Sequence, residues 1–187
     1  MIEEVQRAGE HINAGRVILY PTDTIWGIGC DASDPVAVQK IYEIKNRSDH
    51  KSMLVLMESF SMLYEYLEEI PPGTQEIIRS LVKPTTIIYP KAKNLAINLP
   101  GEDGSIGIRI TSDSFCQKLI QTTGKPIVST SANVSGSAAP ASYKEIDQYI
   151  RKKVDYIVEW RQDAADSVSA SSIVRLDEDG HITLLRP

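Results

Sequence analysis

The sequence is poor in the residues that build redox and metal sites. Its 187 residues include two cysteines and three histidines, and Cys30 and Cys116 lie too far apart to form a CxxC unit. A disulfide framework and a zinc ribbon are therefore unsupported, and we expect two buried free thiols in a reducing compartment. No HExxH motif or cluster of histidine and cysteine is present, so we expect no tightly bound metal held by protein ligands.

Long hydrophobic runs, repeats and linkers are missing as well. No apolar stretch approaches the roughly 18 residues that a membrane span needs. The first 15 residues are acidic and lack the apolar segment of a signal peptide. We therefore expect a soluble, cytoplasmic protein without membrane contact. The absence of repeats and low-complexity tracts predicts one domain over residues 1–187, with no additional C-terminal domain.

Positive charge is scarce overall but concentrated in one segment. Twenty basic and 25 acidic residues give a net charge of −5, which disfavours a protein that coats nucleic acid, because such binding neutralises many phosphates. An anionic ligand must then be held by a local cluster of cations. Residues 40–51 are such a segment, with four cations against two acids.

Short apolar segments typical of strands alternate with segments of helical periodicity. Strands are expected at residues 17–20, 25–30, 53–57, 86–89, 106–110, 127–130, 156–160, 172–176 and 182–185. Helices are expected between residue 2 and Gly15, after Asp34, over 60–67, around 77–81, after a cap at Ser112 or Asp113, and from Ser142. The interleaving predicts a mixed α/β fold, a twisted sheet of parallel and antiparallel strands with helices on its faces. Gly27 and Gly29 predict a strand that approaches a backbone or a ligand closely.

Two segments combine polar groups with a strand end or a helix end. Residues 21–24 (PTDT) place hydroxyls and a carboxylate after a strand, where α/β sheets bind ligands, although taken alone they are better explained by a turn that satisfies its own backbone. Lys45 and Arg47 can converge on a phosphate only if their helix ends near Asn46. Arg47 then offers a planar fork and Lys45 a compact charge. The alternative is that these cations favour the helix C-terminal dipole.

Two strands carry further candidate residues. Ser131 and Asn133 follow a buried strand and share a face if the chain stays extended, so they can donate to phosphate or ribose oxygens. Arg109 lies in an apolar strand, which predicts that it is paired or faces a cavity that takes carboxylate or phosphate. No P-loop or GxGxxG turn is present, and no histidine pairs recognisably with Ser131, so a serine hydrolase has weak support.

Several segments in order resemble a known family: PTDTIWGIGCDA, IYEIKNRSDHKSM, GIRIT, PIVSTSANVSG, SSIVRL and LLRP. They are similar to the YrdC family, specifically to short-form L-threonylcarbamoyladenylate synthases, from about residue 10 onward. The resemblance implies a YrdC-like fold and a nucleotidyltransferase that makes threonylcarbamoyl-AMP and pyrophosphate from L-threonine, bicarbonate and ATP, with Mg²⁺ bound to the ATP. In the family, the product serves threonylcarbamoyl modification of the adenosine next to the tRNA anticodon.

The resemblance also implies roles for individual residues. The family's catalytic KxR…SxN residues match Lys45, Arg47, Ser131 and Asn133. Its threonine-binding positions match Thr24, Arg109, Ser131 and Ser171, with Ser172 as the alternative late serine. Its nucleotide-binding positions match Lys45, Arg47, Lys51, Ser105, Asn133 and Arg186. The sequence departs from the family at Trp26, Leu56 and Arg175, where tyrosine, histidine and aspartate are frequent, which bears on threonine affinity.

The implied partners beyond the substrates are a threonylcarbamoyl-transferase complex that acts on tRNA, which would receive the product, and RNA itself through a weak contact. Two other interpretations stay open: an RNA-binding module of the same fold, and a family paralogue that lacks the activity. Intact Ser131 and Asn133 count against the paralogue, and strongly salt-dependent RNA binding would favour the module.

Overall fold

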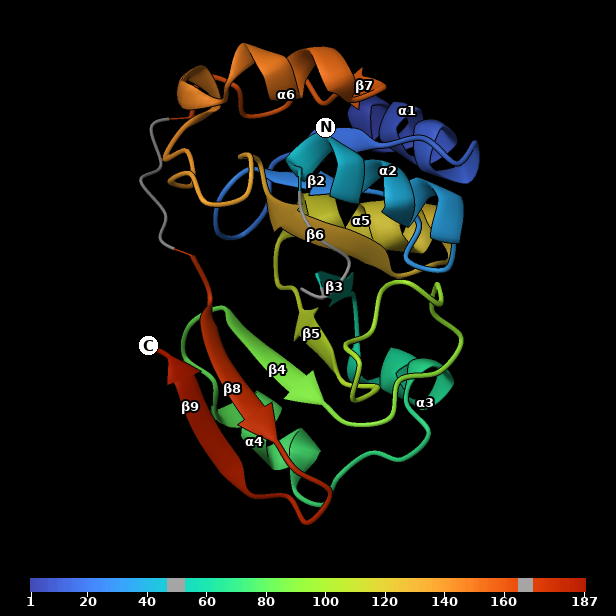
Figure 1. The fold of residues 1–187 in the computed structure, drawn as a ribbon, viewed down its shortest axis with the longest axis vertical. Coiled ribbons are helices and arrows are strands. Elements are labelled where there is room, and N and C mark those ends of the chain that lie inside the picture. Colours follow the sequence, from blue (N-terminus) through green and yellow to red (C-terminus); the bar gives the residue numbers. More distant parts are fainter. Residues whose placement is uncertain (47–52, 165–169) are drawn as a thin grey trace.

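A mixed nine-stranded sheet organises the part of the chain that the computed structural model describes, which is residues 1–46, 53–164 and 170–187. The strand order is β7-β1-β2-β6-β3-β5-β4-β8-β9. The pairs β1/β7, β3/β5 and β4/β8 are parallel, and the other neighbours are antiparallel. The mixed, twisted sheet that the sequence predicts is thus confirmed (Figure 1). The strands are β1 (Ile18–Tyr20), β2 (Gly27–Gly29), β3 (Leu54–Met57), β4 (Thr85–Tyr89), β5 (Ile106–Ile110), β6 (Ile127–Ser131), β7 (Tyr156–Ile157), β8 (Ser172–Leu176) and β9 (Ile182–Arg186).

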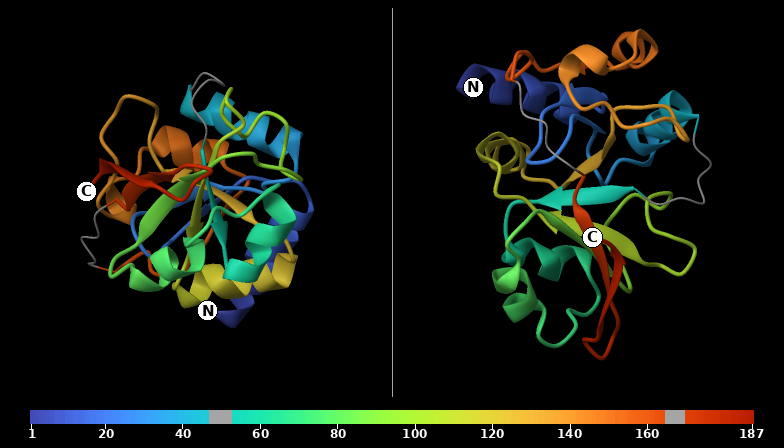
Figure 2. Two further views of the ribbon diagram at one scale, coloured as in Figure 1. Left: turned by 90° about the horizontal axis from the view of Figure 1, so that it is seen from below. Right: turned by 90° about the vertical axis from the view of Figure 1, so that its left-hand side faces the viewer.

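Helices surround this sheet unevenly. In Figures 1 and 2, α1, α2, α5 and α6 lie around the half that contains β1, β2 and β6, whereas α4 lies behind β4 and β8. None of the helices in the described ranges is both long and apolar enough to cross a membrane. The helices are α1 (Ile2–Asn13), α2 (Pro35–Lys45), α3 (Leu63–Tyr66), α4 (Thr74–Ser80), α5 (Ser114–Thr123) and α6 (Gln148–Lys153), with the 3₁₀ turns η1 (Phe60–Met62) and η2 (Tyr143–Glu145).

Helix α2 begins and ends where the sequence predicts. The carboxylate of Asp34 accepts hydrogen bonds from the backbone N–H groups of Val36 and Ala37, at 2.8 and 3.2 Å, and Pro35 occupies the first turn, where its missing N–H costs nothing. At the other end Asn46 adopts the left-handed conformation, with φ of 47°, which stops the helix. The end of α2 is therefore fixed directly after Lys45.

Several predicted elements are wrong in extent. The strand expected over 25–30 is limited to β2, and the helix expected over 60–67 begins as η1 before α3. The single helix expected from Ser142 is divided into η2 and α6, because the Asp147 carboxylate accepts from Tyr149 N at 2.7 Å and so caps a new helix. The strand expected over residues 156–160 is limited to β7. Past its end, the backbone N–H of Glu159 donates to the Glu4 carboxylate at 2.7 Å instead of to a neighbouring strand.

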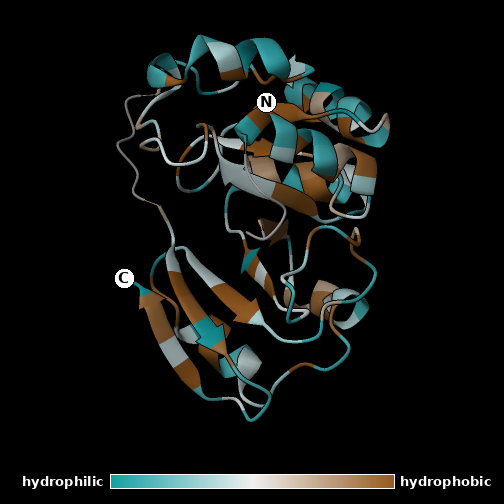
Figure 3. Ribbon diagram, in the orientation of Figure 1, coloured by the Kyte–Doolittle hydropathy of each residue, from teal (hydrophilic) through white to brown (hydrophobic). Residues whose placement is uncertain are grey.

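Side-chain alternation along the central strands gives the sheet two unlike faces. Val55, Ile87 and Ile108 point to one face and join the larger apolar core with residues of α2. On the other face, Leu56 and Ile127 pack with α1 and α5 in a second, smaller core. That smaller core covers only part of its face. Figure 3 shows the hydrophobic residues concentrated in the strands, whereas the outer helix α6 is largely hydrophilic.

Both cysteines behave as the sequence predicts. Cys30 and Cys116 are buried and unpaired. Burial raises the pKa of each thiol well above its usual value, so both stay protonated and unreactive near neutral pH.

Gly29 explains the glycine pattern of β2. A Cβ at this position would lie far inside van der Waals contact of the Val128 carbonyl oxygen, and 2.6 Å from a ring carbon of Tyr20. The predicted close approach is confirmed, and it is to backbone. We expect Gly29→Ala to lower the free energy of unfolding by about 1–3 kcal/mol through overpacking, measured by urea denaturation.

Gly9→Ala in the middle of α1 is the control. Its added methyl meets only side-chain atoms, of Thr122 at 3.1 Å and of Thr123 at 3.8 Å, and alanine gains about 1 kcal/mol of helix propensity. We expect this variant to be at least as stable as the parent. Equal stability of Gly29→Ala and the parent would contradict the packing argument.

Candidate active site

A cavity of about 300 Å³ lies on the sparsely covered face of the sheet. Strands β2 to β6, β8 and β9 contribute to its walls, together with adjoining loops. Small-molecule sites range from about 300 to 1,000 Å³, so the volume suits a small ligand or one part of a larger ligand. The lining residues are Thr24, Ile25, Trp26, Gly27, Met53, Leu54, Thr86, Ile88, Gly107, Arg109, Ser129, Thr130, Ser131, Ala139, Ala170, Ser171, Ile173 and Arg186.

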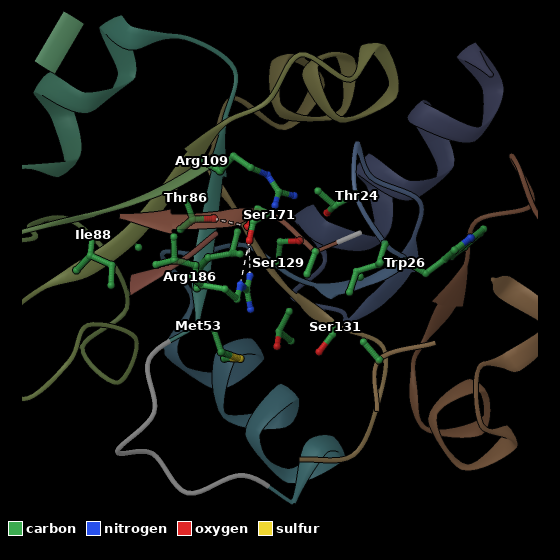
Figure 4. A pocket seen from close by; sticks show the side chains of 18 residues that line it. Thr24, Trp26, Met53, Thr86, Ile88, Arg109, Ser129, Ser131, Ser171 and Arg186 are labelled. Carbon is green, nitrogen blue, oxygen red and sulfur yellow. Dashed lines mark hydrogen bonds between the residues drawn. The ribbon is translucent and has the colours of Figure 1, made fainter. Parts of the chain in front are cut away.

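The charges on this lining are of one sign. Arg109 and Arg186 are its two charged residues within the described ranges, and those ranges contribute no carboxylate to it. Figure 4 shows both guanidinium groups pointing into the space that Thr24, Ser129, Ser131 and Ser171 also border. In a chain with a net charge of −5, this concentration of cations and hydroxyl groups is typical of a site for an anion.

Arg109 is both paired and directed to the cavity. It lies in β5 with 2% of its surface exposed, and its Nη2 is 2.9 Å from Oδ1 of Asp23. Both outcomes that the sequence predicts for a buried arginine therefore hold together. Arg109 is also the partner of Leu56 in the register of β3 with β5. Leucine at position 56, where the family frequently has histidine, therefore places an apolar residue beside Arg109 in the sheet.

Arg186 and Thr86 hold Ser171 at the cavity from two sides. The Arg186 side chain donates to the Ser171 carbonyl oxygen from Nε at 3.0 Å and from Nη2 at 2.6 Å. The hydroxyl groups of Ser171 and Thr86 are 2.9 Å apart and hydrogen-bonded. Ser172 points elsewhere, with a buried hydroxyl outside the cavity lining. Of the two late serines, Ser171 is the one that borders the cavity.

Lys45 joins the end of α2 to the end of β6. Its ammonium donates to the carbonyl oxygens of Ser131 and Asn133 at 2.5 and 2.7 Å, and to Asn133 Oδ1 at 3.3 Å. The Ser131 hydroxyl donates to the same Oδ1 at 2.5 Å. Lys45, Ser131 and Asn133 thus meet in space as the sequence predicts, but Ser131 alone of the three lines the cavity.

The PTDT segment forms a turn that satisfies its own polar groups, and it also borders the cavity. Thr22 satisfies local groups: its hydroxyl donates to the Ile25 carbonyl at 2.8 Å and accepts from Thr24 N at 3.0 Å. This turn directs Thr24 to the cavity, with its own hydroxyl 3.0 Å from that of Thr22.

The remaining predicted residues are Ser105, Arg47 and Lys51. Ser105 is outside it, and its hydroxyl donates to Asp103 at 2.6 Å. That hydrogen bond is the main reason why the pKa of Asp103 falls to about 2. Arg47 and Lys51 lie outside the described residues. The roles predicted for all three stay predictions.

The other two departures from the family pattern have clear surroundings. Trp26 borders the cavity, and its indole extends to one side (Figure 4), where it packs against Tyr143 with ring centroids 5.0 Å apart. Arg175 is half exposed and pairs with Asp103 at 3.2 Å, outside the cavity lining.

Sequence reasoning missed Thr86 and Ser129, which look like ordinary strand residues. It noted the carboxylate of Asp23 in the PTDT segment but not its pairing with Arg109. The shared face of Thr86 and Ser129 emerges only from the pairing of β4 with β5 and of β6 with β3. The one available signal was alternation, since Ser129 and Ser131 must point the same way along β6.

The fold and cavity define a mixed α/β protein with a cavity lined by arginine and hydroxyl groups on one face of its sheet. The sequence model of the Sua5/YciO/YrdC family, described as "Telomere recombination", matches residues 10–187. The chain therefore belongs to this family. The threonylcarbamoyl-AMP synthase of Pseudoalteromonas translucida is 34% identical over 148 residues, which cover 78% of this chain and 79% of the relative. That of Vibrio parahaemolyticus is 30% identical over 161 residues, with coverages of 84% and 87%.

Solved structures agree with this assignment. P. abyssi Sua5 in complex with L-threonine superposes with a TM-score of 0.86 at 26% identity over 98% of this chain, which spans 53% of that protein's length. E. coli YciO gives a TM-score of 0.83 at 24% identity, covering all of this chain and 89% of YciO. The second likeness concerns the fold alone.

The contacts of Lys45 predict a structural cost for its removal. Lys45→Met keeps the apolar stem but removes the ammonium that donates to three oxygens. Ser131 O keeps the Asn133 N–H and Asn133 Oδ1 keeps the Ser131 hydroxyl, whereas Asn133 O loses the ammonium. We expect a loss of about 1–3 kcal/mol in the free energy of unfolding, measured by urea denaturation. Lys40→Met is the control on the same helix, because Lys40 is exposed and makes one 3.3 Å contact with Gly15 O. A Lys45→Met variant as stable as Lys40→Met would refute the argument.

Proposed function

We propose that this protein is a threonylcarbamoyl-AMP synthase, which joins L-threonine, bicarbonate and ATP with release of pyrophosphate. The observation that carries the proposal is the convergence of Arg109, Arg186 and several hydroxyl groups on one cavity whose described lining contains no acid. Relatives of that name at 30% and 34% identity support the enzyme class. The threonine complex of P. abyssi Sua5 supports threonine as a substrate.

The proposed division of labour follows from the cavity's polarity. Arg109 would bind the carboxylate of threonine with its planar fork. Thr24, Ser131 and the Ser171 hydroxyl would contact the amine and hydroxyl ends of the amino acid. Arg186 would face the nucleotide. The family resemblance assigns five further residues to nucleotide binding: Lys45, Arg47, Lys51, Ser105 and Asn133.

The proposed reaction asks for positioning more than for covalent work by the protein. The threonine amine condenses with bicarbonate, with loss of water, to form a carbamate. A carbamate oxygen then attacks the α-phosphorus of ATP, and the bond to the β-phosphate breaks with its electron pair leaving on pyrophosphate. Side chains that hold three anions together in a partly dry cavity lower this barrier by orientation and by stabilising charge.

We further propose that Mg²⁺ accompanies the nucleotide. The described lining offers hydroxyl oxygens and no carboxylate, which fits a metal held mainly by phosphate oxygens and water. When bound, Mg²⁺ would neutralise charge on the departing pyrophosphate. Product delivery to a tRNA-modifying transferase complex, a weak RNA contact and a place in the cytoplasm stay predictions.

The direct test is a pyrophosphate-release assay in which each substrate is omitted in turn. We expect release to require ATP, L-threonine and bicarbonate together, and threonylcarbamoyl-AMP to appear in the product by mass spectrometry. Release without threonine would indicate a plain ATP hydrolase. RNA binding without any turnover would favour the RNA-binding module.

Arg109→Lys tests the carboxylate site within the same assay. Lysine keeps the charge but loses the planar fork, so we expect the KM for threonine to rise at least tenfold, about 1.4 kcal/mol of binding, with the KM for ATP nearly unchanged. Arg175→Lys is the matched control, because it changes an arginine of β8 outside the cavity. An unchanged threonine KM in Arg109→Lys would remove Arg109 from the threonine site.

A further inference from the structure

The carboxylate of Asp23 lies behind the arginine that faces the cavity. Asp23 Oδ1 is 2.9 Å from Arg109 Nη2, and the two side chains are 10% and 3% exposed. Asp23 is not part of the cavity lining, whereas Arg109 is. The carboxylate therefore contacts the guanidinium from outside this cavity, where Asp23 borders a separate cavity of about 230 Å³.

Asp23 is itself held in place from the start of α5. The Thr111 hydroxyl donates to Asp23 Oδ2 at 3.2 Å and accepts from the backbone N–H of Asp113 at 3.1 Å. Asp113 in turn caps α5, accepting from Phe115 N and Cys116 N at 3.0 Å each. A chain of polar contacts thus runs from a helix N-terminus through Thr111 and Asp23 to Arg109.

Burial makes this support necessary. An arginine in an apolar strand is costly unless its charge is neutralised, and its long side chain has several rotamers. The Asp23 contact is an ion pair at one Nη group, and within the described residues both Asp23 Oδ1 and Arg109 Nε are buried without a hydrogen-bond partner. Arg109 thus keeps unused hydrogen-bonding capacity while its charge is neutralised and its position fixed from behind.

We propose that Asp23 is a positioning residue for amino-acid binding, which holds Arg109 in the orientation that accepts the ligand's carboxylate. This inference rests on the proposed function. Asp23 touches no substrate in this arrangement and acts only through Arg109. Its loss should therefore weaken the binding of the amino acid and leave the nucleotide's binding and the turnover of the full complex nearly intact.

Asp23→Asn is the main test because asparagine has the same shape without the charge. We expect the KM for threonine to rise fivefold or more, with kcat and the KM for ATP within twofold of the parent. Thr111→Val removes the hydroxyl that fixes Asp23 and should raise the same KM by a smaller factor. In the variant that combines Asp23→Asn with Thr111→Val, the two increases in the KM for threonine should not multiply, because both changes act through Arg109.

Asp31→Asn is the matched control. Asp31 is also buried and paired with a cation, Lys125, but lies outside the cavity. We expect this variant to lose stability while keeping the threonine KM of the parent.

The outcomes separate this proposal from the proposed function. A threonine KM less than fivefold above the parent in Asp23→Asn, or an equal rise for ATP, overturns the positioning role alone. If Asp23→Asn does not fold, an unchanged threonine KM in Thr111→Val overturns it. If the parent makes no threonine-dependent pyrophosphate, the proposed function fails. The positioning role is then decided by NMR of the Arg109 Nε–H group. We expect its exchange with water to be at least fivefold faster in Asp23→Asn or Thr111→Val than in the parent, and a smaller change refutes the positioning role.

Discussion

A buried ion pair, Asp23 with Arg109, is the contact on which the geometry of the cavity depends. It connects the segment between β1 and β2 to β5, near the middle of the sheet order. Two buried charges are costly to desolvate, and removal of either partner leaves the other uncompensated, at about 3–5 kcal/mol. The pair therefore fixes the β1–β2 connection against β5, and the site is built at that junction. Hydroxyl groups and a second arginine then complete a lining that favours anions.

The sequence predicted those elements whose signals are local. Asp34 with Pro35 marks the start of α2, and Asn46 marks its end, because capping and a left-handed residue act within a few positions of chain. The helix expected after Ser142 was wrong in extent for the same kind of reason: a second cap, at Asp147, restarts the helix. The order of the strands could not be predicted, since it depends on pairings between residues as distant as Thr86 and Ile173.

In the candidate site, too, the sequence predicted the features that are local and missed those that depend on distant contacts. An arginine inside the apolar strand Ile106–Ile110 is unusual enough to be noticed from sequence, and its pairing and its place at the cavity are both confirmed. The identity of its partner, Asp23, was missed, because only the folded sheet shows which carboxylate lies behind it. Lys45 illustrates the converse: sequence predicts a charge available to phosphate, while the structure reveals carbonyl oxygens at the end of β6 that engage its ammonium. The sequence could not predict these contacts, because the acceptors are backbone carbonyl groups that only the fold brings to Lys45.

The lining runs from Thr24 to Arg186, and so draws on almost the full length of the chain. During synthesis, the N-terminal half of the cavity would be made long before β8 and β9 leave the ribosome. The cavity can thus bind its ligand only after the hairpin of β8 and β9 has formed. A ligand that bridges the early and late strands would, by mass action, stabilise the fully folded chain over partly folded states that lack this hairpin.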